Sequence, residues 1–310
     1  MFTTTEKTNN TTGNTPAIFR KKSNVGFFPQ TSLFTPSIQK QGDETKQEYP
    51  TSSGKFKVGA PQRPSIQHDN GFLDAYNEKT GTGDPKFKER APGFSDYAKL
   101  AKWKLMLEGS EALRSDLVDA NAAYRHFLEG NGADRWFNYE RYVENDSSGA
   151  TTLSGAISYA QKHTQAVCAP GKWTQITSGA FTTGQAGDFS FPYPATENWQ
   201  KAIGGHNLWM SGLVYAKQNG KKISYTMALT IHVEDRYNFN PGMQDIKTGI
   251  PDSDNGIFEV TGLGKQYMNF STLTRTVSWS SDAVSTPEVK DDDKSRNRKP
   301  ADNRRLRNKI

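Results

Sequence analysis

The chain has 310 residues, a formal net charge of +6 and 34% hydrophobic residues, with a mean hydropathy of −0.79. One compact domain of this length would be more apolar, and the difference lies at the two ends. Residues 1–92 are rich in Thr, Ser, Gln, Asn, Lys and Pro without any period, and residues 281–310 are charged and almost free of apolar groups. Because neither end can bury enough surface to offset its ordering entropy, we expect a disordered arm, one domain over residues 93–280 and a disordered tail.

The positive charge is confined to the tail. Residues 294–310 contain eight Lys and Arg residues and one Asp, a charge of +7, so the rest of the chain is close to −1. Such a tail can contact an anionic membrane or nucleic acid, and a solvated terminus without a partner is the alternative. The remaining sequence has no zinc-ligand spacing, no helix-turn-helix signature and no basic stripe, which argues against a nucleic-acid reader in the folded part.

The cysteine content and the N-terminal residues indicate where the protein is made and how it is exported. The single cysteine, Cys168, excludes an intramolecular disulfide and a Cys-rich metal site, and its small apolar neighbours predict a buried residue rather than a nucleophile. The chain opens without the apolar core of a signal peptide, and no run approaches the roughly 18 apolar residues of a membrane span. We therefore expect synthesis in the cytoplasm and export by something other than the general secretion pathway.

The first part of the expected domain, residues 93–165, has helical spacing. A helix is predicted over 94–103, a second over 113–128 that ends at Gly130, and a third over 151–165. The apolar face of the second helix is formed by Leu113, Leu117, Ala120, Tyr124, Phe127 and Leu128.

The second part, residues 172–280, changes to a period of two. The clearest pattern is a pair of alternating runs over 208–216 and 223–233, joined by Asn219-Gly220, which is the strongest short hairpin signal. The other expected elements are strands over 189–191, 198–203 and 273–279 and a helix over 260–270. The fold class is therefore α+β, with N-terminal helices packed on a C-terminal antiparallel sheet.

A dense polar segment, residues 232–255, follows the hairpin and is the candidate site. The period of the return strand places His232 and Glu234 together on its polar face. The candidate catalytic residues are His232, Glu234, Asp235, Tyr237 and Asn238. The cofactor stays open, with a divalent metal such as magnesium as one option. The alternative is an ordered structural loop, in which Asp235 or Asn238 caps backbone amides and Arg236 pairs with Asp245 or Glu234.

The exit of the hairpin, Asp235-Arg236-Tyr237-Asn238, resembles the catalytic region of colicin M-type bacteriocins. Those proteins cleave the lipid-linked peptidoglycan precursor with magnesium, and their motif is Asp-x-Tyr-Asp followed by His-Arg. Asp235 and Tyr237 match the motif, whereas Asn238 replaces the second aspartate and no His-Arg follows. These departures remove a metal ligand and a base. The wider unit, residues 199–279, resembles terminal domains of bacterial polymorphic toxins.

Aromatic and basic residues recur within the polar N-terminal segment. Their order resembles the leader of cargo and toxin proteins encoded beside extracellular contractile injection systems, which has Phe-x-Lys-Lys, Gly-Phe-Phe and Phe-x-x-Pro-x-Ile-Gln-x-Lys elements. The matching residues, and hence the candidate loading residues, are Phe19, Lys21, Lys22, Phe27, Phe28, Phe34 and Ile38. The resemblance implies synthesis in a bacterial cytoplasm, binding to tube or loading proteins, export inside a phage-tail-like particle and room for an immunity protein as a further partner.

Three functions follow from these observations. The first is an effector or toxin delivered by an injection particle, with hydrolysis of a cell-envelope precursor as one activity. The second is a non-enzymatic structural or adaptor component of the particle. The third is a membrane-disrupting toxin in which the hairpin inserts into lipid.

Overall fold

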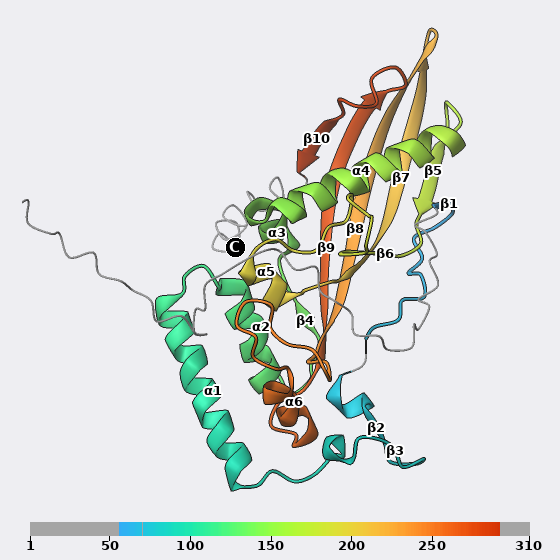
Figure 1. Cartoon of the computed structure of the whole chain (residues 1–310). Coiled ribbons are helices and arrows are strands. Elements are labelled where there is room, and N and C mark those ends of the chain that lie inside the picture. The colour runs from blue at the N-terminus through green and yellow to red at the C-terminus, as the bar shows by residue number, and fades with distance from the viewer. Residues whose placement is uncertain (1–55, 70, 292–310) are drawn as a thin grey trace, which may run out of the picture.

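The computed structural model describes residues 56–69 and 71–291 (Figure 1). The candidate loading residues between 19 and 38 and the basic residues at 294–310 lie outside the described residues. Helices and an eight-stranded, mainly antiparallel sheet make up the described part, so the predicted α+β class is confirmed. None of the helices in residues 56–291 that the structure describes is long and apolar enough to cross a membrane.

Three long strands form the centre of the sheet. β7 (Asn207–Asn219) pairs antiparallel with β8 (Lys222–Tyr237), and β8 pairs antiparallel with β9 (Tyr267–Ser280). The predicted hairpin is confirmed, and Gly220 in its turn has a φ of 61°, which glycine adopts without steric penalty. One face of the hairpin, here called the inner face, is apolar and buried through Leu208, Met210, Val214, Ala216, Tyr225, Met227, Leu229, Ile231 and Val233.

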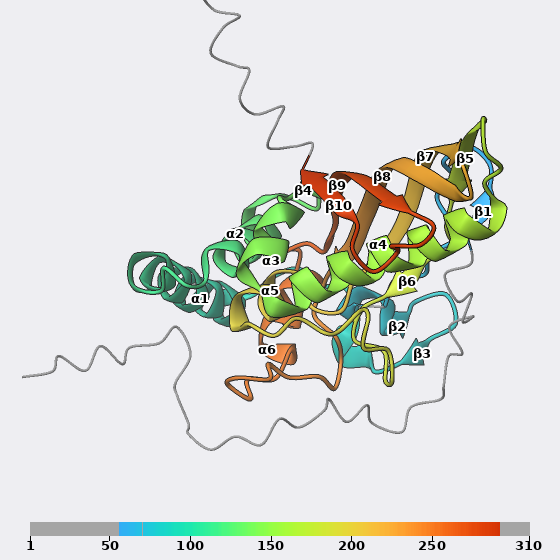
Figure 2. The same cartoon turned by 90° about the horizontal axis from the view of Figure 1, so that it is seen from above.

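The inner face is covered by α4 (Ser147–Val167), which crosses the sheet diagonally (Figures 1 and 2). Asp146 caps this helix by accepting a hydrogen bond from the Ser148 amide at 2.9 Å. Ala156, Ile157 and Ala160 are buried in the same core cluster as the strands. The opposite face of the sheet, here called the outer face, leaves Leu213, Thr226 and Ala228 exposed at its distal end, near the hairpin turn.

Shorter strands complete the sheet on both sides. The order is β1-β5-β7-β8-β9-β10, with β6 paired to β7 and β4 paired parallel to β9. Their bounds are β1 Lys57–Val58, β4 Arg135–Trp136, β5 Trp173–Thr177, β6 Phe181–Thr182 and β10 Glu288–Asp291; a separate ribbon is formed by β2 Tyr76–Asn77 and β3 Thr82–Gly83.

A second apolar cluster lies at the proximal end of the sheet, away from the hairpin turn. It joins α1 (Phe94–Leu113), α2 (Val118–Glu129) and α6 (Ser253–Val260) through Trp103, Leu107, Tyr124, Phe127, Leu128, Phe258 and Tyr267. The remaining helical segments are α3 Tyr139–Asn145, α5 Glu197–Ala202, η1 Phe72–Asp74 and η2 Pro85–Phe87.

Some local predictions were wrong. Residues 198–203 fold mainly as helix α5 rather than a strand, because Trp199 and Ala202 are both buried at helical spacing. The helix expected over 260–270 ends at Val260, since Gly262 takes a φ of 70° and the chain then enters β9. Residues 189–191 form no strand, and Phe189 is 88% exposed.

The second predicted helix, over 113–128, also begins later than expected. Leu113 belongs to the end of α1 and is 66% exposed, and Arg114 to Leu117 separate α1 from α2. The apolar spacing continues across this break, so periodicity alone does not reveal it.

The folded part begins earlier and ends later than expected. Phe56 and Phe72 are only 8% and 1% exposed, so residues 56–92, assigned above to a disordered arm, contribute to the cores. At the other end, β10 pairs with β9 beyond residue 280. The segment 56–92 was missed because it is anchored by isolated aromatic side chains at sites built by distant residues, without a period of its own.

The buried position of Phe72 makes the new boundary testable. Phe72→Ala removes a side chain packed edge-on against Phe87, with ring centroids 4.7 Å apart, and should lower the free energy of unfolding by about 3–5 kcal/mol. Phe94→Ala is the matched control, because Phe94 is 91% exposed, and should change it by less than about 0.5 kcal/mol. Urea unfolding of the full chain measures both; equal midpoints for the two variants would show that segment 56–92 does not pack on the domain.

Candidate functional site

A pocket of about 300 Å³ lies beside the proximal ends of β8 and β9. Its walls come from these strands, from the loop after α2 and from the N-terminal segment. The lining residues are His68, Gly132, Asp134, Arg236, Gln266, Tyr267 and Met268. We call it the β8 pocket.

Glu234 holds one wall of this pocket in place. Strand alternation puts Glu234 on the outer face, where it is 2% exposed and contacts the segment before Phe72. Arg63 donates to Glu234 from Nε to Oε2 at 2.8 Å and from Nη2 to Oε1 at 2.5 Å. The Nε2 atom of His68 lies 3.1 Å from Glu234 Oε1.

The charge state of Glu234 follows from these contacts. Burial raises the pKa of its carboxyl group, but the hydrogen bonds from His68 and Arg63 outweigh burial and leave the pKa below its usual value. An ionised Glu234 accepts a hydrogen bond from the Nε2–H of His68, and this contact selects the tautomer in which Nδ1 carries the lone pair. A carboxylate-oriented imidazole at a pocket wall is an arrangement suited to general-base chemistry.

Two further groups give the β8 pocket binding capacity. Arg236 brings a guanidinium, whose Nη2 lies 3.5 Å from the Asp74 carboxylate and whose Nη1 donates to the Asp69 carbonyl at 3.4 Å. The Oε1 atom of Gln266 is buried and has no hydrogen-bond partner within the described residues. A buried acceptor of this kind can be satisfied by a donor group on a ligand.

His232 lies outside the pocket, farther along the outer face. Its ring stacks on Trp209 with centroids 3.7 Å apart, and Nε2 lies 2.9 Å from the Ser211 hydroxyl. Burial lowers the pKa of His232 to about 4, against the charge of Glu234, so the ring is neutral at pH 7. Because the Glu234 carboxylate is bound by Arg63 and His68, the Ser211–His232 pair has no carboxylate partner on β8.

Asp235 and Tyr237 lie on the inner side of the strand, not with Glu234. The Asp235 carboxyl group is 8% exposed and lies 3.3 Å from Asn269 Nδ2. Burial, with the negative charge of Asp69, raises the pKa of Asp235 well above its usual value. Tyr237 stacks on Tyr267 with centroids 5.1 Å apart, and burial raises its pKa as well. The structure therefore divides the five predicted site residues between two sides of the sheet.

The polar loop after β8 is ordered by its own hydrogen bonds and by two acids, the partly buried Asp252 and the buried Glu259. The fifth predicted residue, Asn238, donates to Asp69 at 3.4 Å. Asp252 accepts from the Asn240 amide at 3.0 Å, and burial raises the pKa of Asp252 to about 6. Glu259 accepts from the amides of Phe72 and Phe239, each at 3.2 Å, and burial raises the pKa of Glu259 to about 7.

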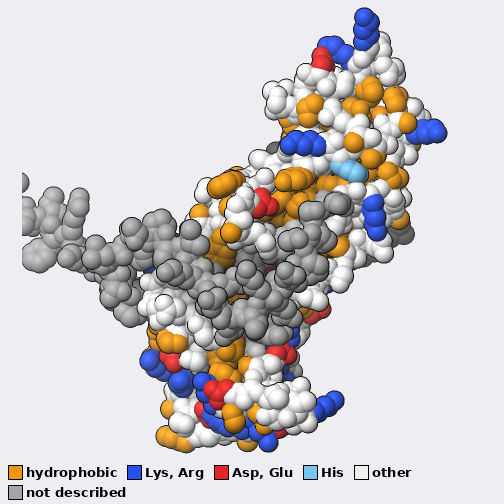
Figure 3. All heavy atoms as spheres, turned by 45° about the vertical axis from the view of Figure 1, so that its right-hand side comes forward, with side chains coloured by type: hydrophobic (Ala, Val, Ile, Leu, Met, Phe, Trp, Pro, Cys, Tyr) orange, Lys and Arg blue, Asp and Glu red, His pale blue; other side chains and the backbone are white. Residues whose placement is uncertain are grey.

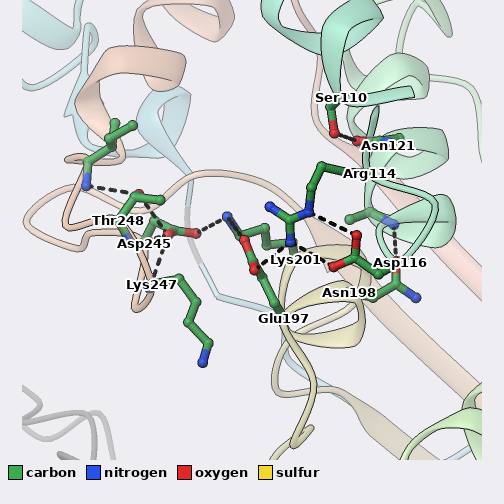
Figure 4. A network of polar contacts seen from close by, with 12 residues as sticks. Ser110, Arg114, Asp116, Asn121, Glu197, Asn198, Lys201, Asp245, Lys247 and Thr248 are labelled. Carbon is green, nitrogen blue, oxygen red and sulfur yellow. Dashed lines mark hydrogen bonds and ion pairs between the residues drawn. The ribbon is translucent and has the colours of Figure 1, made fainter. Parts of the chain in front are cut away.

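A chain of ion pairs fixes the far end of this loop (Figure 4). Lys201 on α5 lies 3.0 Å from Asp245 in the loop and 2.9 Å from Glu197, which lies 3.0 Å from Arg114 after α1. Asp245 also accepts from the amides of Lys247 and Thr248 at 3.0 and 2.7 Å. Residues 238–252 therefore have the character of the structural alternative, although Arg236 pairs with Asp74 rather than with Asp245 or Glu234.

The described residues do not form a set of ligands for a metal ion. Within residues 56–69 and 71–291, no three His, Cys, Asp or Glu side chains are placed to hold one ion. Cys168 is 6% exposed, as its neighbours predict, and burial raises the pKa of its thiol.

The sequence reasoning missed the residues that complete the pocket. Arg63 and His68 lie in the segment assigned to a disordered arm, and Gln266 lies in a stretch expected to be helical. Arg63 and His68 precede Glu234 by 171 and 166 residues, so their contacts with Glu234 leave no trace in the local sequence pattern.

Glu259 predicts a pH dependence of stability. Its pKa is raised in the folded chain from 4.5 to about 7, so its contribution is fully present below pH 4.5 and is lost as the pH rises to about 7. Glu259→Gln abolishes this titration, and the difference in unfolding free energy between wild type and variant should change by about 3 kcal/mol across that window.

The comparison isolates Glu259 from other titrations. His206 and His232, whose pKa values are both lowered to about 4, act with the opposite sign but equally in both chains. Glu108→Gln, at an exposed position on α1, is the control and should run parallel to wild type. Parallel curves for Glu259→Gln and wild type would contradict the raised pKa.

No protein-family model matches the chain, and no curated protein sequence matches it. Among solved structures, the chain is similar to PaeM, a colicin M-like bacteriocin produced by Pseudomonas aeruginosa, with 17% identity, a TM-score of 0.31, and coverage of 52% of this chain and 50% of that one. It is also similar to truncated bacteriocin syringacin M from Pseudomonas syringae pv. tomato DC3000, with 14% identity, a TM-score of 0.32, and coverage of 53% and 60%. The chain thus spans only 50–60% of the length of these structural neighbours.

Proposed function

We propose that this chain is a toxin that hydrolyses a phosphate-bearing precursor of the target cell envelope, with the β8 pocket as its active site. The observation that carries the proposal is the His68–Glu234 pair at the pocket wall, with Arg236 in the same pocket. An oriented imidazole supplies a base, and a guanidinium supplies a partner for an anionic group.

The chemistry assigned to each residue follows from its contacts. Glu234 keeps Nε2 of His68 protonated, so Nδ1 accepts a proton from water as the water oxygen attacks phosphorus. Arg236 offsets the charge that develops on the phosphoryl oxygens, and the leaving oxygen takes a proton from the imidazolium. The Oε1 of Gln266, which has no partner within the described part of the chain, accepts a hydrogen bond from a hydroxyl or amide of the substrate.

Delivery by a contractile injection particle is a second part of the proposal. It rests on the order of the aromatic and basic residues between Phe19 and Ile38, and on their place ahead of a compact domain. In this view residues 1–55 bind tube or loading proteins, and the domain that starts at Phe56 acts in the target cell.

The catalytic assignment predicts a selective loss of toxicity. His68→Gln in the full chain, expressed in the cytoplasm or in the periplasm of a test bacterium, should reduce killing by about 10²–10⁴-fold, the usual contribution of a general base. His163→Gln is the matched control, because His163 lies near the C-terminal end of α4, stacks on Phe56 and does not line the pocket. Killing by His68→Gln at the wild-type level, with unchanged circular dichroism, would remove the β8 pocket as the active site.

The proposed delivery route predicts a loss of particle loading without a loss of toxicity. Deletion of residues 2–45 should abolish co-purification of the chain with injection particles, because it removes all seven candidate loading residues. Killing after direct expression should persist, since the described domain starts at Phe56. Undiminished particle loading of the deletion variant would show that the route is wrong while leaving the catalytic proposal intact.

A further inference from the structure

The distal end of the sheet carries an exposed apolar group on its outer face. Trp173 on β5 lies directly across from Tyr215 on β7, with ring centroids 5.0 Å apart. Trp173 is 65% exposed and the neighbouring Leu213 is 41% exposed. Ala228, opposite Leu213 on β8, is exposed as well and extends the aliphatic surface. We call these four residues the distal patch.

The surroundings of the distal patch carry an excess of positive charge. Residues 204–233 contain three lysines, Lys217, Lys221 and Lys222, and no acidic residue, and residues 169–187 contain Lys172 and no acidic residue. All four lysines are exposed. Among the described residues, Lys222 pairs with Asp282, whereas the other three form no salt bridge.

Asp282 offsets the charge of Lys222, but Lys172, Lys217 and Lys221 have no salt bridge among the described residues. Across the outer face, Tyr215 on β7 is followed in register by Thr226 on β8, Ser278 on β9 and Glu288 on β10. Glu288 is the first acid in this row, and it pairs with Lys290. Figure 3 shows several Lys or Arg side chains and an acidic group at the upper tip of the molecule, with hydrophobic side chains below them. A cationic tip beside an exposed apolar patch is therefore a feature of the distal end as a whole.

We propose that the distal patch docks on an anionic lipid surface. Trp and Tyr favour the level of lipid head groups, where an aromatic body meets acyl chains and its polar edge meets water. Lysines beside them gain from the negative surface potential of anionic lipids. Leu213 and Ala228 add aliphatic area that acyl chains accommodate, which favours a lipid partner over a nucleic acid.

The docking is a peripheral contact and does not depend on the proposed hydrolysis. On β8 the distal patch includes Ala228, whereas the β8 pocket begins at Arg236 on the same strand. Arg236 lies eight residues beyond Ala228 on this strand, a distance of roughly 26 Å. Binding through the tip therefore leaves the pocket well away from the lipid contact.

The tryptophans of the chain provide a site-specific test. Of six tryptophans, only Trp136 and Trp173 are exposed, at 70% and 65%, and the other four are at most 8% exposed. Trp136 lies beside Phe270 near the pocket end. In the full chain, Trp136→Phe leaves Trp173 as the exposed fluorophore, and Trp173→Phe leaves Trp136 as its matched control.

The probe is a vesicle of phosphatidylcholine with brominated phosphatidylglycerol. We expect quenching and a blue shift for Trp136→Phe, little quenching for Trp173→Phe, and neither effect with phosphatidylcholine alone. Lys217→Gln with Lys221→Gln should weaken vesicle binding about 30-fold, roughly fivefold for each lysine. Lys102→Gln with Lys265→Gln, at exposed sites elsewhere, should leave binding unchanged.

Several results would overturn the proposal. Equal quenching in both tryptophan variants would place the lipid contact elsewhere, and an unchanged affinity of the double lysine variant would remove the charge argument. Quenching of Trp173 by a single-stranded oligonucleotide but not by vesicles would assign the distal patch to a nucleic acid. Blue emission from Trp173 before any vesicle is added would show that the chain itself already covers it.

Discussion

The apolar inner face of the central sheet must be shielded from water, and this requirement sets where α3, α4 and α5 lie. β8 has 16 residues and is about 50 Å long, whereas the 21 residues of α4 extend over only about 30 Å. One helix therefore cannot cover the sheet, and the proximal part of its inner face needs other cover. Tyr139 and Tyr142 of α3 and Trp199 of α5 provide it, and all three are at most 1% exposed.

His206 connects these aromatic side chains. It is fully buried, its Nε2 lies 2.7 Å from the Tyr139 hydroxyl, and its Nδ1 lies 3.0 Å from the Gly204 carbonyl. Burial lowers the pKa of His206 to about 4, so the ring is a neutral hydrogen-bonding unit of the core. Two of the five histidines of the chain, His206 and His232, are thereby committed to packing and local hydrogen bonds, whereas His68 faces a pocket.

The same sheet sets the protonation of two neighbouring carboxyl groups, those of Glu234 and Asp235. Because β8 continues through Tyr237, Glu234 and Asp235 lie on opposite sides of one strand. Glu234 finds Arg63 and His68 on the outer face and keeps its charge, whereas Asp235 faces buried groups that favour its neutral form. Two adjacent acids therefore have opposite properties for a geometric reason, and the outer-face acid is the one that can orient a catalytic base.

Local patterns were enough to predict the hairpin, the α+β class and the burial of Cys168, because alternation, an Asn-Gly turn and helical spacing depend on neighbouring residues. They also placed His232 and Glu234 on one face of β8. Three further features could be seen only in the folded chain: segment 56–92 packs on the domain, Trp199 belongs to a helix, and His68 completes the pocket. Those features depend on which distant surfaces meet, and side chains more than 160 residues apart leave no periodic signal of their pairing.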